Sequence, residues 1–305
     1  AHITMLVDEK LKDVVLFNPY LDEVVTIDKK GRDNSILSLW ACSRHLSKLD
    51  FDVLINLHPN ERCSFIDAMT SVKLRTGTTH KIFKWFWDVF TPLDRSMHAA
   101  DMYLDVLQQL GVQDLSNNGL EIFPGEEHFL EAELFWQEQN ITDQDKLIGF
   151  NIGSAVPTKR WPPERFAEVA DIFAAKGYKT VFFGGPMDEE MVAEATGYMQ
   201  TRPIIATGHF AIGGLAAAMR RCCLIITNDS GPMHVAISQK VPIVAMYGPS
   251  NPKLYGPYTK DAVIVTAQPP CQGCADGMKH SCDDLQCMSR MTVCLLYTSP
   301  SPRDA

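Results

Sequence analysis

The stretch TNDSGPMHVAISQKVPIVAMYGPSNP, residues 227–252, carries the pattern that decides the fold. It follows an apolar run that is typical of the end of a buried strand. Asp229 and Ser230 then offer side-chain oxygens at an N-cap, and Pro232 fits the first turn of a helix, where its missing N–H costs nothing. The pattern therefore predicts a strand, a tight turn and a helix, followed by a second buried strand over Val241–Tyr247.

Such a strand, turn and helix N-terminus form an anion site, because free amides and the positive end of the helix dipole face the same crevice. We therefore expect the backbone amides of Ser230, Gly231 and Met233 to meet a phosphate group. Asp229 is unexpected there, since a carboxylate repels phosphate. It is either a plain helix cap or a ligand for an uncharged part of the same molecule, such as sugar hydroxyls.

Two series of alternating strand and helix patterns run along the chain, one before residue 72 and one from residue 147 onward. This alternation predicts an α/β protein with parallel sheets wrapped by helices, and 305 residues suit two domains of about 150 each. We expect a first Rossmann-like domain with its linker over residues 1–143 and a second over residues 144–293. Ligands should bind beyond the carboxyl ends of the strands.

Composition and missing motifs argue against several classes of function. The net charge of −9 gives no support to nucleic-acid binding, which usually shows a basic patch. No apolar run reaches the roughly 18–20 residues that span a bilayer. A dehydrogenase is disfavoured, because no G-x-G-x-x-G follows any strand.

Three motif blocks occur together. They are Asp229–His234 (DSGPMH) followed by Gly248–Pro252 (GPSNP), Pro157–Phe166 (PTKRWPPERF), and Gly184–Glu190 (GGPMDEE). In kind, order and spacing they resemble glycosyltransferase family 9, the ADP-heptose:lipopolysaccharide heptosyltransferases, and the resemblance runs from near residue 1 to about residue 293.

The resemblance implies a GT-B fold, in which two Rossmann-like domains face a cleft. It also implies a cytoplasmic, inverting, metal-independent transferase without a cofactor. Such an enzyme moves heptose from ADP-heptose to the inner core of lipopolysaccharide, a lipid A–Kdo acceptor, and can touch the inner membrane peripherally. The first domain would then hold the acceptor and the second the nucleotide sugar.

Lys159 follows a predicted strand, where its ammonium can meet the pyrophosphate as a compact charge. Its alternative is a surface ion pair with Glu164. By resemblance, Asp229 bonds sugar hydroxyls and His234 lies close to the phosphates, although His234 also suits a purely structural role.

The nucleoside is expected near the second block. Asp188 matches a family position, usually glutamate, that reaches the ribose, and Glu189 can replace it if the shorter side chain falls short. Phe210 is a candidate face for the adenine, with core packing as the alternative.

The ends of the chain bear on catalysis. In the resembled family the general base is an aspartate in the first βα turn, which we expect to precede residue 1, so no base is assigned. Residues 294–305 resemble the conceptual translation of a sequencing-library adapter and are expected to be an artefactual tail.

Four cysteines crowd a polar loop: Cys271, Cys274, Cys282 and Cys287. One half has a metal-like C-x2-C spacing, but the second pair does not match a common zinc ribbon. Structural thiols, a loop disulfide and a zinc or other metal site all remain open.

Residues 81–90 (KIFKWFWDVF) hold five aromatic side chains, and as a helix they would place Lys81, Lys84 and Asp88 on one face. This segment predicts either a flap packed on its own domain or a surface that faces a membrane or a lipid acceptor.

Two other functions fit the same architecture. A nucleotide-sugar epimerase would bind a similar donor and act on the sugar ring, and a binding module would hold the donor without chemistry.

Overall fold

The computed structural model describes residues 1–58, 60–78, 84–94, 96–115, 117–267, 282 and 284–294. By its contacts the chain forms two compact units. Unit 1 comprises residues 1–12 and 20–117, and unit 2 comprises residues 13–19 and the chain from residue 118 onward. Both units contain parallel sheets with helices, so the predicted α/β class is confirmed.

Unit 2 is built on a six-stranded parallel sheet in the order β11-β10-β9-β6-β7-β8. Its strands are β6 Leu147–Asn151, β7 Lys179–Phe183, β8 Ile204–Ile205, β9 Cys222–Asn228, β10 Ile243–Met246 and β11 Ala262–Val265. The chain starts at β6, adds β7 and β8 on one side, and then returns to add β9, β10 and β11 on the other. The order therefore reverses between β6 and β9, which is where doubly wound sheets bind ligands.

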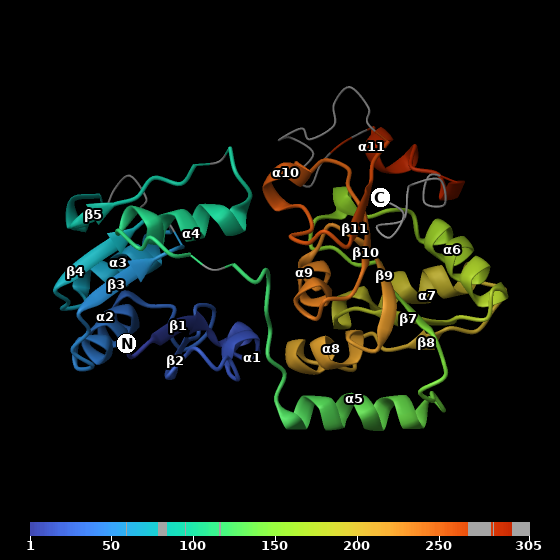
Figure 1. Ribbon diagram of the computed structural model, residues 1–305, viewed down its shortest axis with the longest axis horizontal. Coiled ribbons are helices and arrows are strands. Elements are labelled where there is room, and N and C mark those ends of the chain that lie inside the picture. Colours follow the sequence, from blue (N-terminus) through green and yellow to red (C-terminus); the bar gives the residue numbers. More distant parts are fainter. Residues whose placement is uncertain are drawn as a thin grey trace. The chain divides into compact units, whose positions relative to one another are not determined.

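Helices cover both faces of this sheet (Figure 1). They are α5 Glu126–Glu138, α6 Pro163–Ala175, α7 Glu189–Tyr198, α8 Ile212–Met219, α9 Gly231–Ser238, α10 Pro252–Tyr255 and α11 Gln286–Ser289. Buried side chains of α5, α8 and α9 form one core, and those of α6, α7 and α11 form a second. All five residues of β6 are buried because both faces of that strand are covered.

Unit 1 contains a two-stranded and a three-stranded parallel sheet. Its elements are β1 Thr4–Asp8, β2 Glu23–Ile27, α2 Ile36–Ser47, β3 Val53–Asn56, α3 Glu61–Met69, β4 Leu74–Gly77, β5 Val89–Phe90 and α4 Ala99–Gln109. The short helix α1, Lys12–Val15, lies where the chain passes from unit 1 to unit 2. A capping box between Ser35 and Ser38 starts α2.

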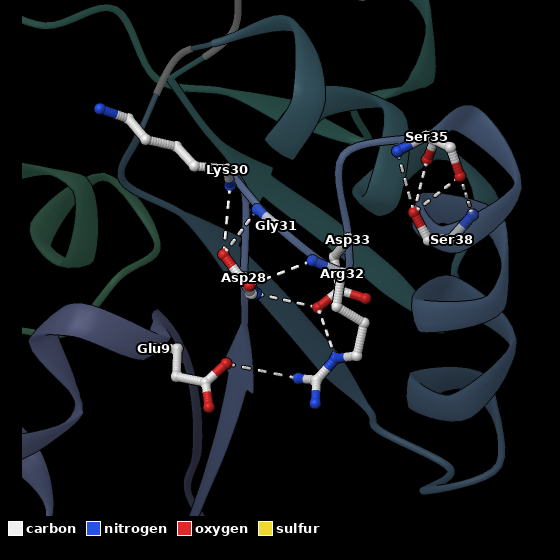
Figure 2. Close-up of polar contacts among 8 residues, drawn as sticks. All are labelled: Glu9, Asp28, Lys30, Gly31, Arg32, Asp33, Ser35 and Ser38. Atoms are coloured by element: carbon white, nitrogen blue, oxygen red, sulfur yellow. Dashed lines mark hydrogen bonds and ion pairs between the residues drawn. The ribbon is translucent and has the colours of Figure 1, made fainter.

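The loop after β2 is closed by one carboxylate (Figure 2). Asp28 accepts hydrogen bonds from the amides of Lys30, Gly31 and Arg32, at 3.3, 2.9 and 3.0 Å. The bonds from Arg32 and Gly31 hold the pKa of Asp28 below its usual value. Arg32 also reaches Glu9 at 3.5 Å, which ties the loop to the turn after β1.

The aromatic segment differs from the expected helix. In its described part, residues 84–86 form a single 3-10 turn and β5 follows, so a helical face shared by Lys84 and Asp88 is wrong. The reason is pairing, because the backbone amide of Asp88 donates to the Arg75 carbonyl and its carboxylate accepts the Arg75 amide. Trp85 is 84% exposed. Lys81 lies outside the described residues.

Candidate functional site

Unit 2 contains a cavity of about 650 Å³ at the reversal of its strand order. The lining comes from the last residue of β6, from the segments that follow β6, β7 and β9, and from α10. It is formed by Asn151, Gly153, Ser154, Ala155, Val156, Lys159, Arg160, Gly185, Pro186, Met187, Asp188, Asp229, Ser230, Gly231, Pro232, His234 and Tyr255. The structure thus brings residues of all three motif blocks to one place.

A buried ion pair forms part of the cavity wall. The Lys159 Nζ lies 2.7 Å from Asp229 Oδ2, with side-chain exposures of 13% and 7%. The partner of Lys159 is therefore the carboxylate at the start of α9, and not Glu164. Water screens the attraction between the two charges of such a pair only weakly.

Two hydroxyls from the β10 end hold the same carboxylate. Ser250 Oγ donates to Asp229 Oδ2, and the hydroxyl of Tyr247 lies 3.3 Å from Asp229 Oδ1 while bonding the Tyr255 carbonyl at 2.8 Å. Burial, and then the neighbouring carboxylate, raise the pKa of Tyr247 above its ordinary value. Asp229 is thereby fixed in place, and its side chain does not cap α9.

The first turn of α9 presents backbone donors to the cavity. The amides of Ser230 and Gly231 bond no acceptor within the described part of the chain. Met233 corrects an expectation, because its amide already donates to the Ser230 carbonyl at 3.2 Å and its side chain is fully buried in the core. Of the three expected amides, two are therefore open.

Two asparagines brace the site from beneath. Asn151 ends β6 and donates to Thr227 Oγ1 at 3.0 Å and to Ser230 Oγ at 2.8 Å. Asn228 ends β9 and donates to the Ile152 carbonyl at 2.7 Å, while its Oδ1 accepts the Trp161 amide at 3.0 Å. These bonds fasten the strand ends together and align the turn that carries Asp229.

The other basic and acidic positions in the wall have structural bonds. Arg160 lines the cavity and donates from Nε to the Ser154 carbonyl at 2.9 Å. Asp188 also lines it, and its Oδ2 accepts the Gly185 amide at 2.9 Å. Its carboxylate lies against Gly153, where an added Cβ would come within 2.1 Å of Oδ1.

Two expected nucleoside contacts stand apart from the cavity lining. Glu189 is exposed, with its carboxylate beside Gly208. Phe210 packs on the α5 and α8 core, with its ring centroid 5.1 Å from that of Phe135. His234 does line the cavity, on the first turn of α9.

Part of the cysteine cluster can be placed. Cys287 is buried on α11, and Cys282 is half-buried with its Sγ 3.3 Å from the Asp284 carbonyl. Cys271 and Cys274 lie outside the described residues. Among the residues that are described, no group of three His, Cys, Asp or Glu side chains has an arrangement suited to a metal ion. Within the same ranges, no helix combines the length and apolar content needed to cross a membrane.

The sequence patterns missed Asn151, Tyr247 and Ser250. Ser250 lies inside the quoted GPSNP motif, so its neighbourhood was marked although its role was not. Asn151 carried a signal of its own, because a polar residue directly ends the buried run of β6. Tyr247 gave none, since an aromatic residue at a strand end also suits plain packing.

Comparisons with known proteins agree on one family. The model of glycosyltransferase family 9 (heptosyltransferase) matches residues 39–282. Lipooligosaccharide heptosyltransferase 2 of Haemophilus ducreyi is 34% identical over 139 residues, which cover 43% of this chain and 40% of that protein. The chain therefore matches about two fifths of the length of this curated relative.

Solved structures extend the match. The glycosyl transferase family 9 protein from Veillonella parvula DSM 2008 is 51% identical, with a TM-score of 0.92 over 97% of this chain and 86% of that chain. Escherichia coli ADP-heptose LPS heptosyltransferase II is 20% identical, with a TM-score of 0.71 over 97% of this chain and 90% of that chain, and this shows a shared fold. The predicted GT-B fold is confirmed. With the family model covering most of its length, the chain belongs to glycosyltransferase family 9, the heptosyltransferase family.

Proposed function

We propose that the protein is an inverting, metal-independent glycosyltransferase that moves heptose from ADP-heptose to the inner core of lipopolysaccharide. One observation carries the proposal: a buried lysine and two open amides of a helix N-terminus line the same cavity as a fixed carboxylate. The cation and the amides suit a diphosphate, and the carboxylate suits hydroxyl groups.

In the proposed complex, Lys159 and the amides of Ser230 and Gly231 hold the diphosphate, with His234 beside it. Asp229 accepts hydrogen bonds from the sugar hydroxyls. The ribose binds near Asp188, on the side of the cavity formed by the segment after β7. The roles of Glu189 and Phe210 require the nucleoside to extend beyond the cavity lining towards Gly208.

The proposed reaction is a direct displacement. An acceptor hydroxyl oxygen attacks the anomeric carbon, the bond from that carbon to the β-phosphate oxygen breaks, and ADP leaves with the electron pair. The hydroxyl proton passes to a general base. Lys159 and the α9 amides stabilise the charge that develops on the leaving phosphate, which is the work a metal ion does in other transferases.

The acceptor side is proposed for unit 1. A Kdo-containing inner core is anionic, and exposed basic side chains such as Lys30 and Arg32 stand on the closed loop after β2. The exposed Trp85 supports peripheral contact with the inner membrane, where aromatic side chains favour the interface.

The test is a thermal-shift series with ADP, UDP, GDP and dTDP on the full chain. A ligand that binds only the folded state raises the melting temperature by mass action, so ADP should give the largest shift. Lys159→Ala should reduce the ADP shift, with a loss of binding free energy of ~1.5–3 kcal/mol for a charge-assisted contact. Glu164→Ala is the matched control, because Glu164 lies outside the cavity lining.

An equal or larger shift with UDP or dTDP would contradict the ADP-heptose donor and leave the fold untouched. Incubation with ADP-heptose and an inner-core acceptor then separates the chemistries. Heptose on the lipid indicates transfer, whereas an altered sugar on the nucleotide indicates an epimerase.

A further inference from the structure

The charges that line the cavity cancel. Among the lining residues, Lys159 and Arg160 are basic, and Asp188 and Asp229 are acidic. A site for a diphosphate usually carries an excess of positive charge, and this one does not. The ammonium best placed for a phosphate is already balanced by a carboxylate at 2.7 Å.

That carboxylate cannot turn away from the ligand. Ser250 Oγ and the Tyr247 hydroxyl hold its two oxygens, and the residue is only 5% exposed. A phosphate oxygen bonded to Lys159 Nζ at a charge-assisted distance of about 2.9 Å lies within about 5.6 Å of Asp229 Oδ2. At that range a carboxylate opposes each added negative charge on the phosphate.

We propose that Asp229 is a specificity-determining residue that favours the sugar ester of a nucleoside diphosphate over the free nucleoside diphosphate. This inference rests on the proposed function. The ester has no ionisable proton on its terminal phosphate, whereas the free diphosphate gains one further negative charge with a pKa of about 6. Asp229 repels that additional charge. The nucleoside diphosphate that transfer leaves in the site is therefore bound less tightly than the nucleotide sugar. A new molecule of the nucleotide sugar then displaces it.

The experiment is calorimetric titration of the full chain with ADP and with ADP-glucose at pH 8, without divalent cations. The wild-type protein should prefer ADP-glucose. Asp229→Asn keeps an oxygen that can accept from Lys159 but removes the charge, so it should bind ADP roughly tenfold more tightly than the wild type does. The same substitution should leave ADP-glucose unchanged or weaker, since the amide is a poorer acceptor for sugar hydroxyls.

Asp188→Asn is the matched control. It removes a carboxylate from the same cavity, but that carboxylate bonds the Gly185 amide and not Lys159. Its effect on the ratio of the two dissociation constants should be at most a third of that of Asp229→Asn. An equal effect would mean that total cavity charge, and not Asp229, sets the preference, and the inference would be overturned.

A second variant protects against poor folding of Asp229→Asn, whose melting temperature without ligand is measured first. Lys159→Met leaves the carboxylate unbalanced, so ADP should weaken more than ADP-glucose and the ratio should move the opposite way. The inference is contradicted if folded Asp229→Asn binds ADP no more tightly than the wild type does. It is also contradicted if Lys159→Met leaves the ratio of the ADP and ADP-glucose dissociation constants unchanged. Neither result would contradict the proposed function. A wild-type protein that binds neither ligand contradicts the proposed function instead.

Discussion

At the residue scale, one carboxyl group makes stability depend on pH. Asp67 on α3 is 8% exposed and accepts a hydrogen bond from Asn56 Nδ2. Burial raises its pKa to about 7, against the smaller lowering effects of Asn56 and of the Arg75 charge. A raised carboxyl pKa gives stability that is fully present below the unfolded-state value near 3.8 and is lost as pH rises through about 7.

Asp67→Asn removes this ionisation and keeps an oxygen for Asn56. In urea unfolding, the free energy of unfolding of the variant should rise relative to that of the wild type between pH 4 and 7. At higher pH the variant should remain more stable by ~1–4 kcal/mol. Asp52→Asn is the control, because Asp52 is 75% exposed in its pair with Lys73. It should change stability by less than ~1 kcal/mol throughout. A constant difference between Asp67→Asn and the wild type would refute the assignment.

At the element scale, two helical glycines predict opposite effects. An added Cβ at Gly213 on α8 would lie 2.3 Å from the ring of His128 on α5. That ring is held in place because its Nδ1 accepts a hydrogen bond from the Gly125 amide. Gly213→Ala should therefore force α8 and α5 apart and cost ~1–3 kcal/mol. At Gly197 on α7 nothing lies within 4 Å, so Gly197→Ala should stabilise by up to ~1 kcal/mol. Chemical denaturation of both variants checks the pair, and a stable Gly213→Ala protein would show that the α5–α8 packing is looser than described.

Elements are also the scale at which sequence patterns succeed or fail. The residues of β2 and the turn between β9 and α9 were predictable, because apolar runs and N-cap chemistry are local. The strand β4 reads LRTG, with one large apolar side chain, and no pattern marked it. Lys159 and Asp229 pair although they are 70 residues apart in the chain. The sequence suggested a pyrophosphate or Glu164 as the partner of Lys159, and sugar hydroxyls or a helix end as the partner of Asp229. Neither pairing nor charge balance can be read from spacing, because both depend on how the strand ends meet.

At the scale of the whole molecule, ligand binding and unfolding should be linked through unit 2. Trp136 and Trp161 are buried in that unit, 5% and 0% exposed, whereas in unit 1 Trp87 is half-buried and Trp40 and Trp85 are 49% and 84% exposed. Tryptophan fluorescence therefore reports mainly the unfolding of unit 2. ADP at a hundred times its dissociation constant should add about 2.7 kcal/mol to the fluorescence-detected transition. Iodide quenches the exposed Trp40 and Trp85, and this quenching should change little at the same ADP concentration. If ADP does not shift the midpoint of the fluorescence-detected unfolding transition, the nucleotide does not bind to unit 2.

The short segment 13–19 has a consequence for biosynthesis. It packs on unit 2, where Asp13 accepts the Gly213 amide at 3.1 Å and Phe17 meets the His128 ring at 5.5 Å between centroids. Its partner on α8 lies 200 residues later in the chain. At a translation speed of roughly 5–20 residues per second, the segment waits on the order of 10–40 seconds for that partner. If unit 1 folds during synthesis, residues 13–19 must remain without their partners in unit 2 until those partners have been made. The order in which the chain is synthesised therefore differs from the order in which its segments can pack.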